Sequence, residues 1–481
     1  MFTKEDFVIE FYNEFHLLVT NQKIKYFDEL QIYYNQLFKK LLSKHKLKKL
    51  FPIIPKKSEL YSIYMNLVVV KRLPDNYIME AVFTSKIVRS NSGVLPISIA
   101  LDGRKGSCDD DCSMCPDECI KEGATEDIAR SYLSTEGTFI RGKIQDFSIV
   151  EQTWRRLAEL EIMGHVPDKF EFILLGGTFD CFPREYRFQV AIDIFYACNM
   201  YQLLSTRCNG TNSSLLDEWY KTNPFATNRP LSVKLTESLY HIRPRPIIET
   251  KEFSEKQILS LLTFEQEMNT KSSFCRVIGM VLETRPDRIN RYSMTDLRKF
   301  GCTRVQIGIQ SDNDYVLAYN NRGHKTIRSI QANKDLRDAG FKIDGHIMPD
   351  LPGTTIEIDY GTVRNVFQGD HLQLDYCKIY PCLDLPFTKI RGWKKTGKWK
   401  PIAENQFHEF LIFLAYTMSI VPPWTRVNRV QRDFPEASVL NNGLGYVSQT
   451  IKTSMFAKRY ILMKEFIQRM ELDEKNVARI R

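Results

Sequence analysis

The chain lacks the features that mark several large classes of protein. No stretch approaches the ~20 consecutive apolar residues of a membrane-spanning helix, and the N-terminus, MFTKEDFVIEFYNEF, has no basic region followed by an apolar run. No internal repeat or low-complexity tract is present. The eleven cysteines are odd in number and scattered, which argues against a disulfide framework and for a reducing interior. These absences predict a soluble, cytoplasmic protein with no membrane partner.

Positive charge is in modest excess and is concentrated in one segment. The formal net charge is +9 and the sequence pI is about 8.8, a balance that favours a polyanionic partner. Residues 1 to about 90 show helical apolar periodicity and include the lysine-rich run KKLLSKHKLKKLFPIIPKK. The alternative is a solvated amphipathic helix that buries leucines such as Leu41 and Leu47. We predict nucleic-acid contacts from Lys39, Lys40, Lys44, Lys46, Lys48 and Lys49.

Three closely spaced cysteines give the strongest chemical signal. Cys108, Cys112 and Cys115 stand in the run GSCDDDCSMCPDEC, and this CxxxCxxC spacing allows one short loop to hold three irons of a [4Fe-4S] cluster. The fourth iron would stay open, and in radical S-adenosylmethionine (SAM) enzymes that open iron binds SAM. The alternative is a zinc site, since Cys119 extends the series to four thiolates.

From about residue 91 the pattern predicts an α/β fold. Apolar runs of strand length alternate with helical segments such as 149–163 and 325–339, which is typical of a parallel sheet with crossover helices. We expect an open, partial (β/α)6 TIM-like barrel over residues 91–400, with a polar insertion at about 205–255. Helical extensions are expected at 1–90 and at 401–481. The predicted strands are 94–101, 170–175, 276–283, 304–309, 342–348 and 373–380.

Polar or small residues follow the predicted strands. In a barrel of this kind, functional groups gather in the loops at the carboxyl ends of the strands. GGTF follows the second strand, ETRPD the third and IGIQS the fourth, and CKIYP ends the sixth. Buried strands do not supply several converging polar groups by chance, so these ends predict a ligand site.

Taken in order, the motifs closely resemble the catalytic subunit of Elongator, a family of radical SAM enzymes that modify tRNA uridines. The resemblance runs from about residue 85 to about residue 436. It rests on LLGGTF, ETRPD, GCTRVQIGIQS, NRGH, GFKIDGHIMPDLPG, KIYP and VPPWTRVNRVQRD. It implies a radical SAM barrel, a basic N-terminal region that grips tRNA, and a transferase reaction that adds a carboxymethyl group to C5 of the wobble uridine. In the family a second, acetyltransferase domain binds the acetyl-CoA donor.

The resemblance also implies a role for individual residues. The cluster ligands would be Cys108, Cys112 and Cys115. The SAM contacts would be Gly176, Gly177, Thr178, Glu283 and Gln310. Lys378 and Tyr380 would have a catalytic role on the substrate side. Besides the lysines already named, tRNA contacts are expected from Arg426, Arg429 and Arg432, which stand three apart.

The chain also departs from the family pattern. Asp109, Asp110 and Asp111 stand beside the cluster cysteines, where added negative charge would make a cluster harder to reduce. No Q/RxxGxG/A acetyl-CoA loop is present, so we expect the acetyltransferase domain to be absent and any donor to be free acetyl-CoA or to come from a separate acetyltransferase or Elongator-like accessory subunits. Three interpretations remain: modification of the wobble uridine with an external donor, a radical SAM tRNA enzyme with another donor, or a non-catalytic tRNA-binding or regulatory protein. The three thiolates favour the first two.

Overall fold

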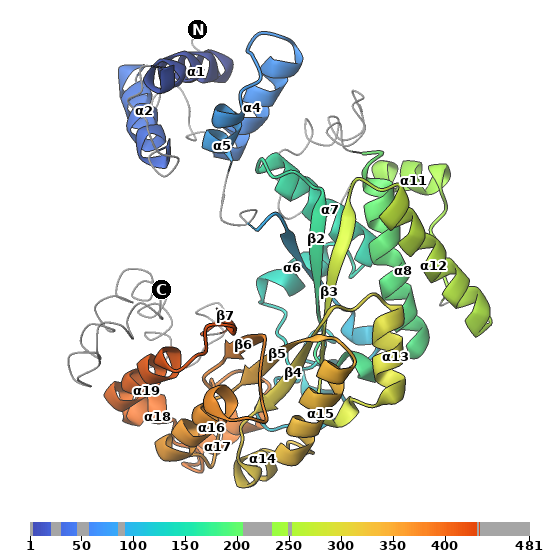
Figure 1. Cartoon of the computed structure of the whole chain (residues 1–481), viewed down its shortest axis with the longest axis vertical. Helices are drawn as coiled ribbons and strands as arrows, with labels where there is room; N and C mark the ends of the chain where they lie inside the picture. The colour runs from blue at the N-terminus through green and yellow to red at the C-terminus, as the bar shows by residue number, and fades with distance from the viewer. Residues whose placement is uncertain are drawn as a thin grey trace.

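The computed structural model describes residues 3–20, 30–45, 57–84, 92–204, 233–248, 253–430 and 432. Helices come first along the chain, and a parallel sheet surrounded by further helices follows (Figure 1). No helix among the described residues is both long and apolar enough to cross a membrane.

The N-terminal helices share a core rich in aromatic side chains. Phe7, Phe11 and Phe15 recur every four residues, which places them on one face of the first helix, where each is at most 1% exposed. Leu41 and Phe83 from later helices belong to the same core. The helices are α1 (Lys4–Thr20), α2 (Leu30–Lys44), α4 (Lys57–Val69) and α5 (Tyr77–Phe83).

Seven parallel strands lie side by side in sequence order and curl into a half-barrel (Figure 1). The six apolar runs that predict strands form the first six of them, so the predicted α/β barrel class is confirmed. The strands are β1 (Leu95–Ala100), β2 (Lys169–Leu175), β3 (Arg276–Thr284), β4 (Arg304–Gln310), β5 (Lys342–Ile347), β6 (Tyr376–Ile379) and β7 (Arg426–Arg429).

The seventh strand is a difference from the sequence-based expectation. The pattern predicts helix throughout residues 401–481, but β7 lies in this region and pairs with β6, with Arg426 opposite Tyr376 and Val427 opposite Cys377. The strand has four residues and two of them are arginines, so neither an apolar run nor a clear alternation marks it. Pairing with an existing sheet edge, rather than local propensity, makes this segment a strand.

Helices cover the outer side of the sheet and lie beyond the ends of its strands (Figure 1). They are α6 (Gly137–Ile144), α7 (Ile149–Ile162), α8 (Arg184–Tyr201), α11 (Val233–Ile242), α12 (Glu255–Lys271), α13 (Arg291–Lys299), α14 (Asp314–Tyr319), α15 (Thr326–Asp338), α16 (Ile356–Gln368), α17 (Lys389–Lys395), α18 (Ile402–Asn405) and α19 (Phe407–Ser419). Short 3-10 turns are η3 (Gly103–Lys105), η4 (Ile120–Glu122), η5 (Phe179–Cys181) and η6 (Pro286–Arg288).

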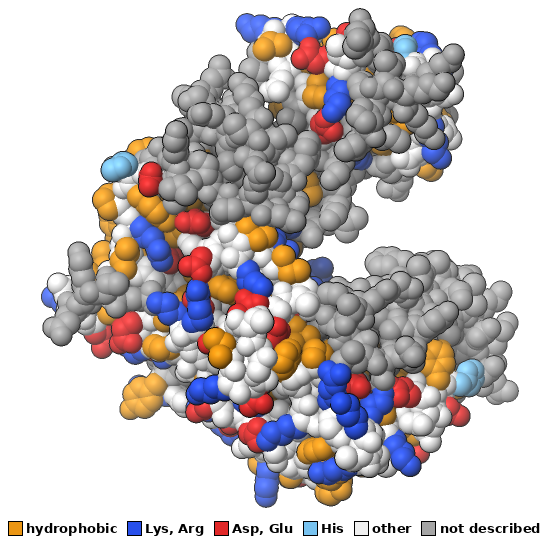
Figure 2. Space-filling view, turned by 180° about the vertical axis from the view of Figure 1, so that it is seen from behind, with side chains coloured by type: hydrophobic (Ala, Val, Ile, Leu, Met, Phe, Trp, Pro, Cys, Tyr) orange, Lys and Arg blue, Asp and Glu red, His pale blue; other side chains and the backbone are white. Residues whose placement is uncertain are grey.

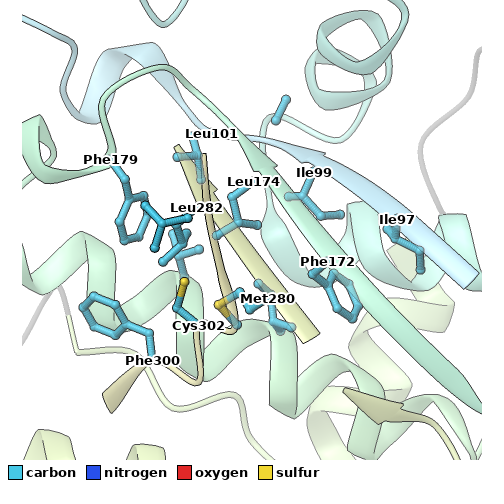
Figure 3. Close-up of a cluster of buried hydrophobic side chains, with 14 of the residues drawn as sticks. Ile97, Ile99, Leu101, Phe172, Leu174, Phe179, Met280, Leu282, Phe300 and Cys302 are labelled. Carbon is cyan, nitrogen blue, oxygen red and sulfur yellow. The ribbon is translucent and has the colours of Figure 1, made fainter. Parts of the chain in front are cut away.

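The alternation of side chains along the strands separates the core from the barrel interior. On β1 to β3 one set of alternate residues, including Ile99, Leu174 and Leu282, packs into the hydrophobic core with Phe300 (Figure 3). The other set points to the opposite face. Glu283 therefore lies on the interior side, one position after the core residue Leu282.

Two buried carboxylates hold the C-terminal part of the insertion that the sequence predicts at about 205–255. Arg243 contacts Glu265 of α12 at 2.7 Å, and Arg245 contacts Asp193 of α8 at 2.5 Å. Glu265 and Asp193 are at most 1% exposed. The arginines of the run HIRPRP thus attach residues after α11 to the outer helices of the barrel.

Candidate active site

The loop after β1 carries the three cysteines of the CxxxCxxC run. Cys112 is 3% exposed, and the guanidinium groups of Arg285 and Arg322 each donate to its Sγ at 3.4 Å. Donation from the Cys115 thiol and the charge of the two arginines lower the pKa of Cys112 to about 5. The Ser131 hydroxyl donates to Cys115 Sγ at 3.2 Å. The structure therefore favours a thiolate at Cys112, which is the form that binds a metal.

Cys108 lies at the start of the run, next to the turn that follows β2. The Thr178 hydroxyl donates to Cys108 Sγ at 3.5 Å. The sulfur atoms of Cys108 and Cys181 and a carboxylate oxygen of Asp109 all lie within 4.8 Å of one another. In the described part of the chain, no other group of three or more histidine, cysteine or acidic ligand atoms is as close together.

The zinc alternative needs a fourth thiolate from Cys119. Zinc holds its sulfur ligands at about 2.3 Å in a tetrahedron, which brings the sulfur atoms into near contact with one another. The described residues do not place Cys119 with Cys108, Cys112 and Cys115 in such a group. An iron–sulfur cluster lies between its cysteines and needs no such contact among them, so the three thiols of the CxxxCxxC run fit a cluster.

Each aspartate of the run CDDDC has a cationic partner on another element. The sequence alone predicts uncompensated negative charge at this place, but the structure pairs all three carboxylates. Ion pairing with these cations offsets the negative charge that would oppose reduction of a cluster. The pairs are Asp109 with Arg288 at 3.1 Å, Asp110 with Arg285 at 2.9 Å and with Arg288 at 3.0 Å, and Asp111 with Arg130 at 3.5 Å and with Lys389.

The GGTF turn after β2 packs closely against the segment that follows the cysteines. Gly177 has a φ of 73°, in the left-handed region that side chains disfavour, and a Cβ there would stand 2.7 Å from the carbonyl oxygen of Arg130. A Cβ on Gly176 would stand 2.8 Å from the Leu101 side chain. Both glycines are thus needed for this close approach. The structure brings the turn to the cysteine loop, as the strand order predicts, while its contact with SAM stays a prediction.

Polar side chains from separate strands meet on the interior face of the half-barrel. The Tyr132 hydroxyl donates to Glu283 Oε2 at 2.7 Å, and the other Glu283 oxygen lies 3.8 Å from His346 Nδ1. The His346 ring stands edge-on to the Tyr380 ring, with the ring centroids 5.6 Å apart. Glu283 and Tyr380, both predicted site residues, are therefore connected through His346.

A second polar group surrounds Lys378. Its Nζ donates to Gln306 Oε1 at 2.8 Å, and Gln306 Nε2 donates to Asp344 Oδ2 at 3.3 Å. Asn428 of β7 donates to the same Asp344 oxygen at 2.9 Å. Burial lowers the pKa of Lys378 to about 8 and raises the pKa of Asp344. Lys378 can therefore exchange its proton near neutral pH, as a general acid or base must.

Gln310 ends β4, at the same edge of the sheet as the other predicted site residues. Its φ of 69° turns the chain out of the strand. Its side-chain oxygen is buried and accepts no hydrogen bond from the described residues, which leaves an acceptor for a ligand. Next to it, Arg322 donates to the Gly308 carbonyl at 2.7 Å while it also contacts Cys112. The ends of β3 and β4 thus adjoin the cysteine loop.

The basic residues predicted to contact nucleic acid lie in different surroundings. Lys39 is exposed on α2, and Lys46, Lys48 and Lys49 lie outside the described residues. The other two lysines of the set contact carboxylates of α1, namely Lys40 with Glu14 and Lys44 with Glu10, both at 2.6 Å.

The three predicted arginines also differ in their exposure and in their contacts. Arg426 and Arg429 are exposed on β7. Arg432 pairs with Glu136 at 2.6 Å and lies over the Tyr132 ring, 4.4 Å from its centroid. The structure therefore places the Arg432 guanidinium beside the Tyr132–Glu283 contact, at the wall of the candidate site.

Several residues of the site were not predicted from the sequence. Arg285 and Arg322 stand in ETRPD and NRGH, so a search for cations within the ordered motifs would have found them. Tyr132 and His346 contact Glu283 from other elements. Cys181 reaches Cys108 only because η5 turns back beside the cysteine loop, and no spacing in the sequence indicates this contact.

The chain is similar to known radical SAM and Elongator proteins. The family model of the radical SAM superfamily matches residues 249–359, and that of the radical SAM C-terminal domain matches residues 374–455. The chain is 29% identical over 368 residues to the tRNA uridine(34) acetyltransferase of Methanocaldococcus jannaschii. It is 28% identical over 374 residues to Elongator complex protein 3 of Saccharomyces cerevisiae. Each match covers 76% of this chain and 56% of the relative, so the chain spans little more than half the length of these relatives.

A solved structure shares the fold. The archaeal Elp3 of Methanocaldococcus infernus, with an N-terminal deletion, aligns with a TM-score of 0.50 at 24% identity, covering 75% of this chain and 63% of that one. Together with the family models and the curated relatives, this match confirms the resemblance inferred from the ordered motifs.

Proposed function

Because the chain is a radical SAM protein related to the Elongator catalytic subunits, we propose that it modifies the wobble uridine, uridine 34, of tRNA. The proposed reaction is a carboxymethylation-type transfer to C5 of the base. The proposed two-carbon donor is acetyl-CoA.

The observation that carries the proposal is the surroundings of the cysteine loop. Three thiols stand at the carboxyl end of β1, and two buried arginines from the next motifs along the sheet point to the central thiol. A zinc-binding module or a purely RNA-binding surface has no need for this arrangement. It suits a redox centre whose charge changes during the reaction, because nearby cations stabilise the more negative state.

The residues present fit a [4Fe-4S] cluster and SAM. Cys108, Cys112 and Cys115 would hold the cluster, and Gly176, Gly177, Thr178, Glu283 and Gln310 would contact SAM. With SAM, such a cluster supplies a 5'-deoxyadenosyl radical, which abstracts hydrogen from unreactive C–H bonds. Glu283 offers a carboxylate to ribose hydroxyls, and the Tyr132 hydroxyl fixes the direction in which that carboxylate points.

Lys378 and Tyr380 are proposed to face the uridine. Lys378 Nζ, with its pKa lowered to about 8 by burial, holds or releases a proton at the base. Tyr380 is held edge-on by His346 and offers a ring face to a base that has left its stack. The exposed or undescribed basic residues Lys39, Lys46, Lys48, Lys49, Arg426 and Arg429 are proposed to contact the tRNA backbone. Lys40, Lys44 and Arg432, which pair with carboxylates, are proposed to border its site.

The test is anaerobic reconstitution of the cluster followed by reduction in the presence of SAM, with formation of 5'-deoxyadenosine measured by chromatography. We expect the wild-type chain to form 5'-deoxyadenosine. Cys112→Ala should lose both this product and the brown chromophore while it keeps tRNA binding, because Cys112 is a cluster ligand. Cys119→Ala is the matched control and should keep all three properties.

Two results would contradict the proposal. If Cys112→Ala and Cys119→Ala were equally impaired in folding, and zinc restored both, the loop would be a structural zinc site. If the wild-type chain held a cluster and bound tRNA but formed no 5'-deoxyadenosine, the chain would be a tRNA-binding protein and not a radical enzyme.

A further inference from the structure

A strongly basic segment lies in and after α17. The twelve residues KIRGWKKTGKWK, at positions 389–400, contain six lysines and arginines and no acid. Lys395, Lys398 and Lys400 are exposed. Figure 1 places α17 and α14 at the same end of the half-barrel, and Figure 2 shows Lys and Arg side chains gathered over that end.

Aromatic rings are interleaved with these cations. Tyr315 and Tyr319 of α14 have ring centroids 5.8 Å apart, and Tyr319 meets Trp393 of α17 at 5.5 Å. Lys398 Nζ lies 3.8 Å from the Trp393 ring centroid and 5.3 Å from that of Tyr319. Tyr315, at the outer end of this row, is 61% exposed. The row therefore presents a ring face to solvent beside positive charge.

This surface is attached directly to the cysteine loop. The Ile390 amide donates to the Ser113 carbonyl at 3.3 Å, and the Asp117 amide donates to the Phe387 carbonyl at 2.9 Å. Ile390 also belongs to the small buried cluster that contains Cys112. A molecule bound on the surface is thus close to the loop that holds the reactive centre.

We propose that Tyr315, Tyr319, Trp393, Lys395, Lys398 and Lys400 form a rim surface that binds the unpaired loop of an RNA hairpin. This inference rests on the proposed function and adds a place where the substrate loop is held. Single-stranded RNA is recognised by aromatic side chains that stack on splayed bases, together with cations that follow the backbone phosphates. The rim surface combines both within one α14–α17 contact.

The aromatic row favours RNA over an acidic electron-transfer protein. An acidic partner would need only the lysines, and a ring exposed at 61% next to them would add little. A base stacked on Tyr315 would use the ring face and leave the lysines for the flanking phosphates. RNA held there also lies beside α17, whose Ile390 contacts the cysteine loop.

The experiment measures binding of two probes to the anaerobically reconstituted chain: a hairpin RNA with the length of an anticodon arm, and a blunt RNA duplex of equal length. The rim variant is Lys395→Glu, Lys398→Glu, Lys400→Glu. The control is Lys169→Glu, Lys256→Glu, Lys271→Glu, which makes the same change of charge at exposed positions on β2 and α12. Iron content and thermal midpoint, measured for every variant, show that each one folds and holds its cluster.

We expect the rim variant to bind the hairpin at least about tenfold more weakly and to lower the slope of log Kd against log salt by about 2, while the control changes little. Tyr315→Ala should weaken hairpin binding about fivefold or more and leave duplex binding nearly unchanged, and Tyr315→Trp should restore it.

Equal hairpin affinity for the rim variant, the control and the wild type would overturn the inference. So would a loss of hairpin and duplex binding to the same extent in Tyr315→Ala. If hairpin binding were unchanged but an acidic flavodoxin reduced the cluster of the rim variant more slowly, the surface would dock a reductant instead. A wild-type chain that binds the hairpin through this surface but forms no 5'-deoxyadenosine would contradict the proposed function and leave the rim surface in place.

Discussion

Arg285 and Arg322 set the electrostatics of the cysteine loop at the scale of single residues. Both guanidinium groups contact Cys112, and Arg285 also pairs with Asp110. The three aspartates that the sequence places next to the cluster are therefore part of an ion-pair network. Their negative charge is balanced by cations from η6, from α17 and from the segment before α6.

Arg285→Met is expected to make the cluster harder to reduce, because it removes a cation next to Cys112 and leaves Asp110 with one partner fewer. The midpoint potential should fall by on the order of 50–100 mV. A redox titration followed by electron paramagnetic resonance measures it, with the exposed Arg291→Met as the control. A potential that stays the same, or rises, would mean that Arg285 does not act on the cluster.

The lowered pKa of Lys378 predicts how the free energy of unfolding depends on pH. Its pKa of about 8 in the folded chain lies below the ordinary value of 10.5, so the unfolded chain binds more protons between these two values. The free energy of unfolding therefore rises with pH across this window, by at most ~3 kcal/mol for this group.

Lys378→Met should remove this rise, whereas Lys169→Met, at an exposed position on β2, should keep it. Urea unfolding at several pH values between about 7 and 10 measures the difference. The same Lys378→Met variant should lose tRNA modification, because the proposed proton carrier is gone. If the variant kept the wild-type pH dependence of stability, burial would not lower the pKa of Lys378 in the folded chain.

The site residues could be predicted only in part. Glu283, Gln310, Lys378 and Tyr380 all end strands of one parallel sheet, and a parallel sheet collects the carboxyl ends of its strands on one edge, so their proximity followed from strand order. The partners that orient them could not be predicted. Tyr132 and Cys181 come from loops whose paths depend on tertiary packing and leave no periodic signal in the sequence.

At the scale of elements, the strands with long apolar runs were predictable and β7 was not. Runs such as RVIGMVLE carry their own signal because both faces of the strand are covered. β7 is defined by its partner β6, and the interior residue Asn428 reaches Asp344 only through that pairing. The insertion is a similar case, since HIRPRP has no regular pattern and is positioned by carboxylates on α8 and α12.

Arg245→Ala is expected to destabilise the chain by about 2–4 kcal/mol, because it takes a cationic partner from a fully buried carboxylate. Asp193 is 0% exposed. Urea unfolding measures the loss, and limited proteolysis should show faster cleavage near α11. The double variant Arg245→Met, Asp193→Leu should recover most of the stability, since no buried charge is left. A single variant as stable as the wild type would show that the pair does not fix this segment.

At the scale of the whole molecule, we expect substitutions in two groups of basic residues to affect tRNA binding to different extents. Lys40 and Lys44 contact carboxylates of α1, so Lys40→Ala with Lys44→Ala is expected to change the Kd for tRNA by about twofold or less. Lys46→Ala with Lys48→Ala and Lys49→Ala should weaken binding more and lower its salt slope by about 2. Titrations at several salt concentrations test both. An unchanged salt slope in the triple variant would remove these lysines from the tRNA interface.

The Glu136–Arg432 pair has a consequence for how the protein is made. Its two residues are 296 positions apart, yet the pair borders the same wall as Tyr132 and Glu283. Each of the strands β2 to β7 can dock on a neighbour that has already been synthesised, whereas this wall needs a residue that follows all seven described strands. Contacts between residues this far apart in the sequence slow folding. A nascent chain therefore builds most of its sheet on the ribosome while its reactive centre stays incomplete until position 432 has emerged.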